Sequence, residues 1–121
     1  MVYINEREDG QLDLDDLEQN LIKYSDPTIY GSRLKIGCFT AASNITGTLV
    51  DTNSVSILLH KYGSLSFWDY ATAAPHVHIN MNPFVEKENS ELVYKDAIYL
   101  SCHKFIGGPQ TPVRKLIFKI N

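Results

Sequence analysis

The sequence predicts an α/β domain with a partial, mostly parallel sheet and flanking helices. Short apolar runs typical of strands alternate along the chain with amphipathic segments at helical spacing. Three of the strand-like runs lead directly into polar clusters. Alternating strands and helices imply parallel strands joined by right-handed crossovers. In such sheets ligands bind beyond the carboxyl ends of the strands, so the polar clusters mark the expected site.

Length and composition fit one globular domain. The chain has 121 residues, 44% of them hydrophobic and 21% charged, which argues against a collagen, a coiled coil or a disordered chain. A net charge of −3 indicates no broad basic surface, so nucleic acid is not an expected partner. No apolar stretch reaches the ~18–20 residues of a membrane span, and no signal peptide opens the sequence. We expect a cytoplasmic protein, with an organelle as the alternative.

The first elements are predicted from spacing and end signals. Val2–Ile4 is a brief strand-like start, which the polar turn at residues 8–10 ends. A helix follows with Asp13 as its N-cap, and Pro27 stops it. Its apolar residues stand at helical spacing: Leu14, Leu17, Leu21 and Ile22.

The middle of the chain predicts a strand and a second helix. Residues 34–39 form the strand, and the small, polar loop 40–44 follows. Asp51 is the expected N-cap of the helix, and Gly63 ends it. The residues expected to face inward are Val55, Leu58 and Leu59.

The second half predicts three further strands. Residues 65–68 run into Asp69, and residues 97–100 run into the polar cluster 101–104. Residues 116–120 form the last strand. The segment 82–96 is the least patterned part, and we expect a loop with some helix there.

Lys104 and Asp69 are the strongest candidates for chemistry. A lysine is nucleophilic only when part of it is neutral, so its free pKa of ~10.4 must fall through burial or a positive neighbour such as His103. The alternative is a solvated surface lysine. A carboxylate after a buried strand needs a partner, and a cationic ring nitrogen would serve. Alternatively, Asp69 caps a turn at residues 71–74.

Other polar groups suggest a phosphate site but neither a metal site nor a hydrolase. Ser101, His103 and the Gly107–Gly108 turn could hold a phosphate, or the glycines could simply form a tight turn. His76-x-His78 has no third and fourth ligand at sensible spacing, so no metal is expected. Ser101 lies in no Gly-x-Ser-x-Gly elbow, which argues against a hydrolase triad.

Three motifs, in order and sensibly spaced, resemble one family. They are Ala42-Ser43-Asn44-Ile45-Thr46-Gly47, then Phe67-Trp68-Asp69-Tyr70-Ala71 with Pro75-His76, then Ser101-Cys102-His103-Lys104 with Gly107-Gly108-Pro109. Together they resemble the class V aminotransferase family, the cysteine desulfurase and selenocysteine lyase group of pyridoxal-phosphate enzymes. The resemblance covers nearly the whole chain.

The resemblance implies a role for each matching residue. Lys104 looks like the catalytic lysine that forms a Schiff base with pyridoxal 5'-phosphate. The other cofactor-binding matches are Asp69 at the pyridine nitrogen, Ala71 under the ring, and Ser101 and His103 at the phosphate. Asn44 resembles the asparagine that orients the substrate carboxylate. Thr72 departs from the glutamine that usually contacts the ring hydroxyl, and its hydroxyl is a partial substitute.

The resemblance also implies an incomplete enzyme. Residues 1–121 match a single partial large domain of the fold type I pyridoxal-phosphate transferases, without the amino-terminal segment or the carboxyl-terminal small domain. Full-length relatives act on amino acid substrates, and a homodimer or a complementing subunit is expected. The alternatives are a non-catalytic pseudoenzyme or interaction module that retains the scaffold, and, more weakly, a flavodoxin-sized ligand-binding domain.

Overall fold

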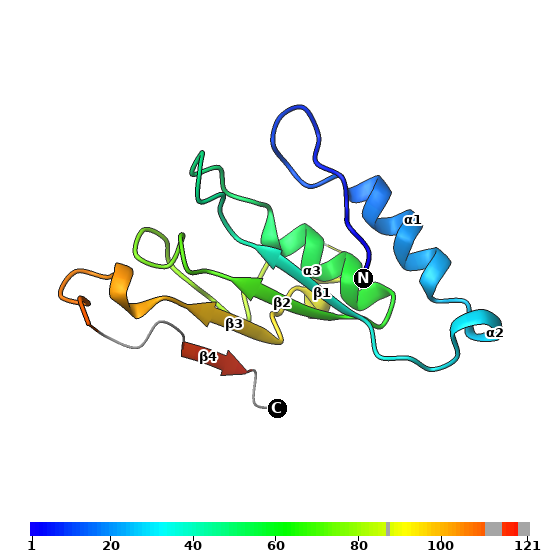
Figure 1. Ribbon diagram of the computed structural model, residues 1–121. Coiled ribbons are helices and arrows are strands. Elements are labelled where there is room, and N and C mark those ends of the chain that lie inside the picture. Colours follow the sequence, from blue (N-terminus) through cyan, green and yellow to red (C-terminus); the bar gives the residue numbers. More distant parts are fainter. Residues whose placement is uncertain (87, 111–114, 119–121) are drawn as a thin grey trace.

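The computed structural model describes residues 1–86, 88–110 and 115–118, and a sheet forms its centre (Figure 1). The strands lie side by side in chain order: β1 (Ile36–Thr40), β2 (Leu65–Asp69), β3 (Ala97–Leu100) and β4 (Lys115–Phe118). β1, β2 and β3 pair in parallel, and β4 runs antiparallel to β3. The α/β class with a mostly parallel sheet is confirmed. The antiparallel β4 departs from the simple strand–helix alternation, because no α-helix separates it from β3 among the described residues.

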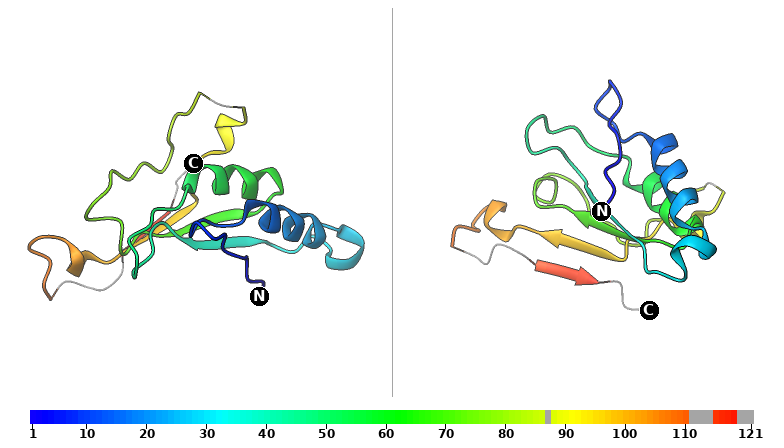
Figure 2. Two further views of the ribbon diagram at one scale, coloured as in Figure 1. Left: turned by 90° about the horizontal axis from the view of Figure 1, so that it is seen from above. Right: turned by 45° about the vertical axis from the view of Figure 1, so that its right-hand side comes forward.

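Two helices cover one face of the sheet (Figure 2). α3 (Thr52–Lys61) packs on β2, where the buried indole of Trp68 donates a hydrogen bond to Ser56 Oγ at 3.1 Å. α1 (Leu14–Tyr24) packs beside α3 and contributes Leu17 and Leu21 to the same apolar core. None of the described helices is long and apolar enough to cross a membrane.

The predicted helix ends are confirmed in atomic detail. Asp13 Oδ1 accepts the backbone N–H groups of Asp15 and Asp16, both at 3.0 Å. Asp51 caps α3 in the same way, and Gly63 follows the last turn of that helix with φ +65°. These signals act over two to four residues, which is why the sequence predicts them well.

Two expectations for the first half need correction, at Val2–Ile4 and at Ile22. Val2–Ile4 forms no strand, because the chain instead makes a small loop closed by a bridge between Glu6 and Leu12. The first helix ends at Tyr24, before Pro27 as predicted, and Pro27 itself occupies the first position of the short helix α2 (Pro27–Tyr30), where its missing N–H is no loss. Ile22 is 56% exposed and lies away from the core.

The strands and the segment before β3 follow the prediction with small shifts. The strand expected at 34–39 covers Ile36–Thr40, and β3 has the predicted bounds. The described part of segment 82–96 contains the 3₁₀ turn η1 (Ser90–Leu92), in agreement with a loop that has some helix. The last strand, expected at 116–120, is Lys115–Phe118, and residues 119–120 lie outside the described residues.

Candidate functional site

The carboxyl ends of the three parallel strands meet at one edge of the sheet, toward which β1, β2 and β3 all point in Figure 1. The loop after β1 carries Asn44, the turn after β2 carries Thr72, and the turn after β3 is a 3₁₀ turn, η2 (Cys102–Lys104). The Ala41 N–H donates to the Asp69 carbonyl at 2.9 Å, which ties the first two of these ends together. The parallel register therefore gathers the predicted polar clusters.

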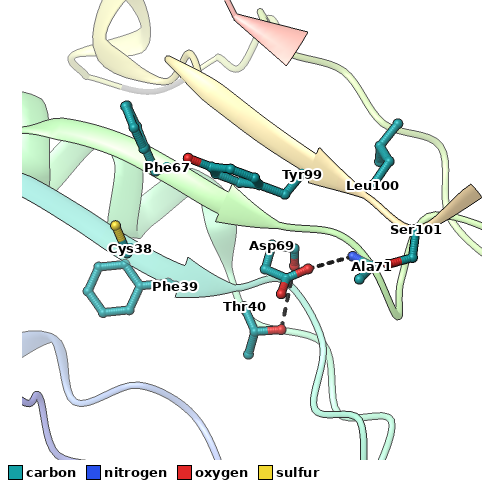
Figure 3. Close-up of a pocket in the computed structure, with 9 residues that line it drawn as sticks. All are labelled: Cys38, Phe39, Thr40, Phe67, Asp69, Ala71, Tyr99, Leu100 and Ser101. Atoms are coloured by element: carbon teal, nitrogen blue, oxygen red, sulfur yellow. Dashed lines mark hydrogen bonds between the residues drawn. The ribbon is translucent and has the colours of Figure 1, made fainter. Parts of the chain in front are cut away.

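A cavity of about 530 Å³ opens at this edge and extends over the sheet face that lies away from α3 (Figure 3). Residues of all three strand ends line it: Cys38, Phe39, Thr40, Phe67, Asp69, Ala71, Tyr99, Leu100 and Ser101. This volume lies within the range of small-molecule sites. Of the residues singled out from sequence, Asp69, Ala71 and Ser101 line the cavity.

The Asp69 carboxylate stabilises its own turn and keeps one oxygen for another partner. Oδ1 accepts the N–H of Ala71 at 2.7 Å (Figure 3), so the capping alternative is part of its role. Its second oxygen accepts no hydrogen bond from the described residues. Asp69 is exposed, because β2 ends where the helix layer no longer covers the sheet. The side chain can therefore support the turn and contact a ligand in the cavity.

Lys104 forms a cluster with Asn44 and Thr72. Its Nζ lies 3.5 Å from Asn44 Oδ1 and 3.4 Å from Thr72 Oγ1. The Thr72 hydroxyl donates its proton to Asn44 Oδ1 at 3.2 Å. The lone pairs of Thr72 Oγ1 can therefore accept a hydrogen bond from the Lys104 amine. Among the described residues, no carboxylate forms a salt bridge with Lys104. Lys104 is exposed, and the described atoms that its amine contacts are the neutral oxygens of Asn44 and Thr72.

Ser101 and His103 have different environments. Ser101 is 7% exposed, lines the cavity and stands at the N-cap position of η2 without a side-chain capping bond. His103 is exposed and does not line the cavity. The structure therefore brings Ser101, but not His103, to the cavity wall.

The glycine pair after Lys104 is explained by the turn. Gly107 has φ +79°, a conformation that L side chains rarely adopt. A Cβ at Gly108 would collide with the carbonyl oxygens of Cys102 and Phe105, and the Gly108 N–H already donates to Phe105 O at 2.9 Å. The tight-turn alternative accounts for both residues.

The sequence analysis did not identify the residues that form the cavity wall on the sheet face away from α3. Cys38, Phe67 and Tyr99 stand two residues before Thr40, Asp69 and Ser101, respectively. Alternate residues of a strand share a face, so counting back by two from each polar residue would have found them. Tyr70, the residue after Asp69, is buried, and burial raises the pKa of its phenol.

Comparisons with known proteins agree with this arrangement. The family model described as "Aminotransferase class-V" matches residues 1–110. None of the curated proteins compared matches the sequence. Among solved structures, a NifS-like protein from Rickettsia africae ESF-5 superposes with a TM-score of 0.73 at 22% identity, covering 95% of this chain and 27% of that one.

Two further structures share the fold. The apo cysteine desulfurase from Thermococcus onnurineus NA1 has a TM-score of 0.65 at 21% identity and covers 97% of this chain and 24% of that one. Mouse CSAD in apo form has a TM-score of 0.67 at 15% identity, with 94% and 23% covered. The chain therefore spans about a quarter of the length of the structures it matches.

Proposed function

The chain belongs to the class-V aminotransferase family, and on this premise we propose that it forms part of a pyridoxal-phosphate site that acts on amino acids, as a cysteine desulfurase does. The observation that carries the proposal is the meeting of Lys104, Asp69 and Ser101 at one edge of the sheet, beside a cavity of suitable size. Asp69 is the last residue of β2, Ser101 and Lys104 lie in the turn after β3, and these two strands pair in parallel.

The donor set fits the cofactor. Asp69 has a carboxylate oxygen without a partner among the described residues, and a protonated ring nitrogen suits it. Ser101 brings a hydroxyl to the cavity wall without a capping bond, as a phosphate contact requires. The Lys104 amine contacts the neutral oxygens of Asn44 and Thr72, and no salt bridge with a carboxylate among the described residues holds it away from an aldehyde. The remaining assignments are Ala71 beneath the ring and His103 at the phosphate.

Each residue has a defined chemical task in this proposal. The cofactor supplies an electron sink for charge at the substrate α-carbon. Asp69 keeps the ring nitrogen protonated by its negative charge. The Lys104 amine would hold the cofactor at its aldehyde carbon, with release of water, and when free it would carry the α-proton as a general base. Asn44 orients the substrate carboxylate through its amide, and Thr72 fixes that amide through the 3.2 Å hydrogen bond.

The length of the chain sets the expected level of activity. Because it spans about a quarter of the structures it matches, we expect weak cofactor affinity and slow or no turnover from these residues alone. The same proposal includes the removal of sulfur from a cysteine-like substrate. It also includes pairing of the chain with a second copy or with a complementing subunit. Turnover would then require segments that complete the cavity.

Covalent capture of the cofactor tests the proposal directly. The chain is mixed with pyridoxal phosphate, reduced with borohydride, and digested for mass spectrometry. We expect the cofactor mass on Lys104 at least five times more often than on Lys23, an exposed lysine in the last turn of α1. Lys104→Ala should abolish the main product, whereas the matched Lys23→Ala should leave it unchanged.

Two more variants separate specific binding from simple aldehyde reactivity. Ser101→Ala and Asp69→Asn should each lower the captured fraction at Lys104, because they remove a phosphate donor and the charge at the ring nitrogen. Equal labelling of Lys104 and Lys23 in the unchanged protein would overturn the proposal. It would favour the pseudoenzyme or interaction module, a reading supported by the exposed position of His103 away from the cavity.

A further inference from the structure

A buried histidine in the last turn of α3 has both ring nitrogens hydrogen-bonded. His60 Nδ1 lies 2.6 Å from the Leu92 carbonyl oxygen, and its Nε2 lies 2.8 Å from Asp96 Oδ2. The His60 side chain is 4% exposed and that of Asp96 is 19% exposed. The pair lies at the end of the sheet opposite the cavity and has no part in the proposed function.

The partners determine how many protons the ring holds. A carbonyl oxygen can only accept, so His60 Nδ1 carries a proton. The contact between Nε2 and Oδ2 needs a second proton, which lies on one atom or the other. Asp96 Oδ2 also accepts the Ser66 N–H at 2.7 Å, and hydrogen bonds of this kind favour an ionised carboxylate. With Asp96 ionised, this geometry requires the second proton on Nε2, which makes His60 an imidazolium ion.

The surroundings support a positive ring. Tyr94 stacks on His60 with ring centres 3.9 Å apart, and burial together with the charge of Asp96 raises the pKa of Tyr94, so it faces the ring as a neutral phenol. A positive charge in the last turn of a helix is also favoured by the helix dipole.

The other charged groups around the ring are directed elsewhere. On α3, Lys61 pairs with Glu18 of α1 at 3.1 Å. From the segment before β3, Lys95 reaches Asn53 in the first turn of α3. Glu91 of η1 makes no salt bridge among the described residues. Asp96 is thus the described carboxylate that pairs with His60.

We propose that the protonated His60–Asp96 pair is a pH-sensitive clasp that fastens the segment Leu92–Asp96 to α3 and to the start of β2. The segment comes from the long excursion between β2 and β3, which runs past the helices before it returns to the sheet (Figure 2). The Asp96 N–H also donates to Ser66 O at 3.0 Å, so the clasp closes directly before β3 begins at Ala97.

Loss of either charge opens the clasp. When pH rises and His60 loses a proton from Nε2, a lone pair faces the Asp96 carboxylate and the hydrogen bond is lost. When pH falls and Asp96 is protonated, the ion pair is lost as well. We therefore expect the amide protons of residues 92–96 to be protected best at intermediate pH. At alkaline pH they should exchange faster than the rise in the intrinsic amide exchange rate with pH explains.

Nitrogen NMR of the histidine rings tests the proposal. In the ¹⁵N-labelled chain at neutral pH, His60 should show two protonated ring nitrogens, and the signals of the exposed His76 and His78 serve as internal references. Asp96→Asn keeps an oxygen for the Ser66 N–H but removes the charge. In this variant His60 should show one protonated nitrogen, and amide exchange at 92–96 should lose its bell-shaped pH dependence.

Either of two results would overturn the proposal. One is a His60 ring with a single protonated nitrogen throughout the neutral range in the unchanged chain. The other is an Asp96→Asn variant whose His60 signals and amide exchange match those of the unchanged chain. The first measurement needs no variant, so it decides the question even if Asp96→Asn does not fold.

Discussion

The contact between Gly37 of β1 and Leu59 of α3 permits a quantitative prediction about packing. A Cβ at position 37 would lie 2.5 and 2.6 Å from the two terminal methyl groups of Leu59, and 2.9 Å from the Phe39 ring. Leu59 is 1% exposed, so its methyl groups cannot turn into solvent. Overpacking a core costs about 1–3 kcal/mol, and we expect Gly37→Ala to lower the free energy of unfolding by about 2 kcal/mol.

A second substitution relieves the same contact. Leu59→Ala alone removes a fully buried side chain and should cost about 3 kcal/mol, within the range for such changes. In the double variant the new methyl group at position 37 enters the space that Leu59 leaves. The combined loss should therefore fall short of the sum, about 5 kcal/mol, by at least about 1 kcal/mol, because substitutions in contact are not additive.

Urea unfolding measures these differences. Trp68 is the one tryptophan of the chain and is completely buried beside this contact, so its fluorescence reports loss of the core. Leu34→Ala, at a side chain that is 71% exposed, is the control and should change stability by less than about 0.5 kcal/mol. A Gly37→Ala variant as stable as the unchanged chain, or losses that simply add, would refute the packing argument.

Three further predictions concern charge, capping and the site. Burial lowers the pKa of Lys95, so the folded chain binds fewer protons at this lysine than the unfolded chain, and the contribution of Lys95 to the free energy of unfolding should rise with pH up to ~10.4. In urea titrations at pH 7 and 9.5, Lys95→Met should remove this contribution and add about 1–4 kcal/mol at pH 7. Asp13→Ala should cost about 1 kcal/mol in thermal unfolding, and an equal loss from Asp15→Ala, which removes no cap, would argue against the capping role. Thr72→Val should lower cofactor capture at Lys104 about 2–5-fold and Thr72→Ser should restore it, unless the 3.4 Å contact has no role.

Local signals in the sequence predicted the elements well. Asp13 and Asp51 cap their helices, Gly63 follows the end of α3, and β3 has the expected bounds. The helix ends depend on backbone groups within about four residues, so tertiary packing changes them little. The β3 run forms the expected strand because β2 and β4 lie beside it. The prediction of a strand at Val2–Ile4 failed because a short apolar run becomes a strand only when a partner strand lies beside it.

The candidate site was predictable to the level of the sheet edge. Asp69 ends β2, Ser101 and Lys104 follow β3, and parallel strands bring their carboxyl ends together. The sequence could not decide which of their side chains face the cavity, because a short turn after a strand can direct a side chain either way. The structure turns Ser101 inward and leaves His103 outside.

By itself, the sequence determined the class of fold, the approximate positions of α1, α3 and the four strands, and the family to which residues 1–110 belong. Only the tertiary structure decided that β4 runs antiparallel, that Lys95 is buried, and that His60 meets Asp96 across 36 residues. The first group follows from short-range hydrogen bonds and apolar spacing. The second depends on which distant surfaces exclude water together, and that is a property of the whole packed chain rather than of any one segment of it.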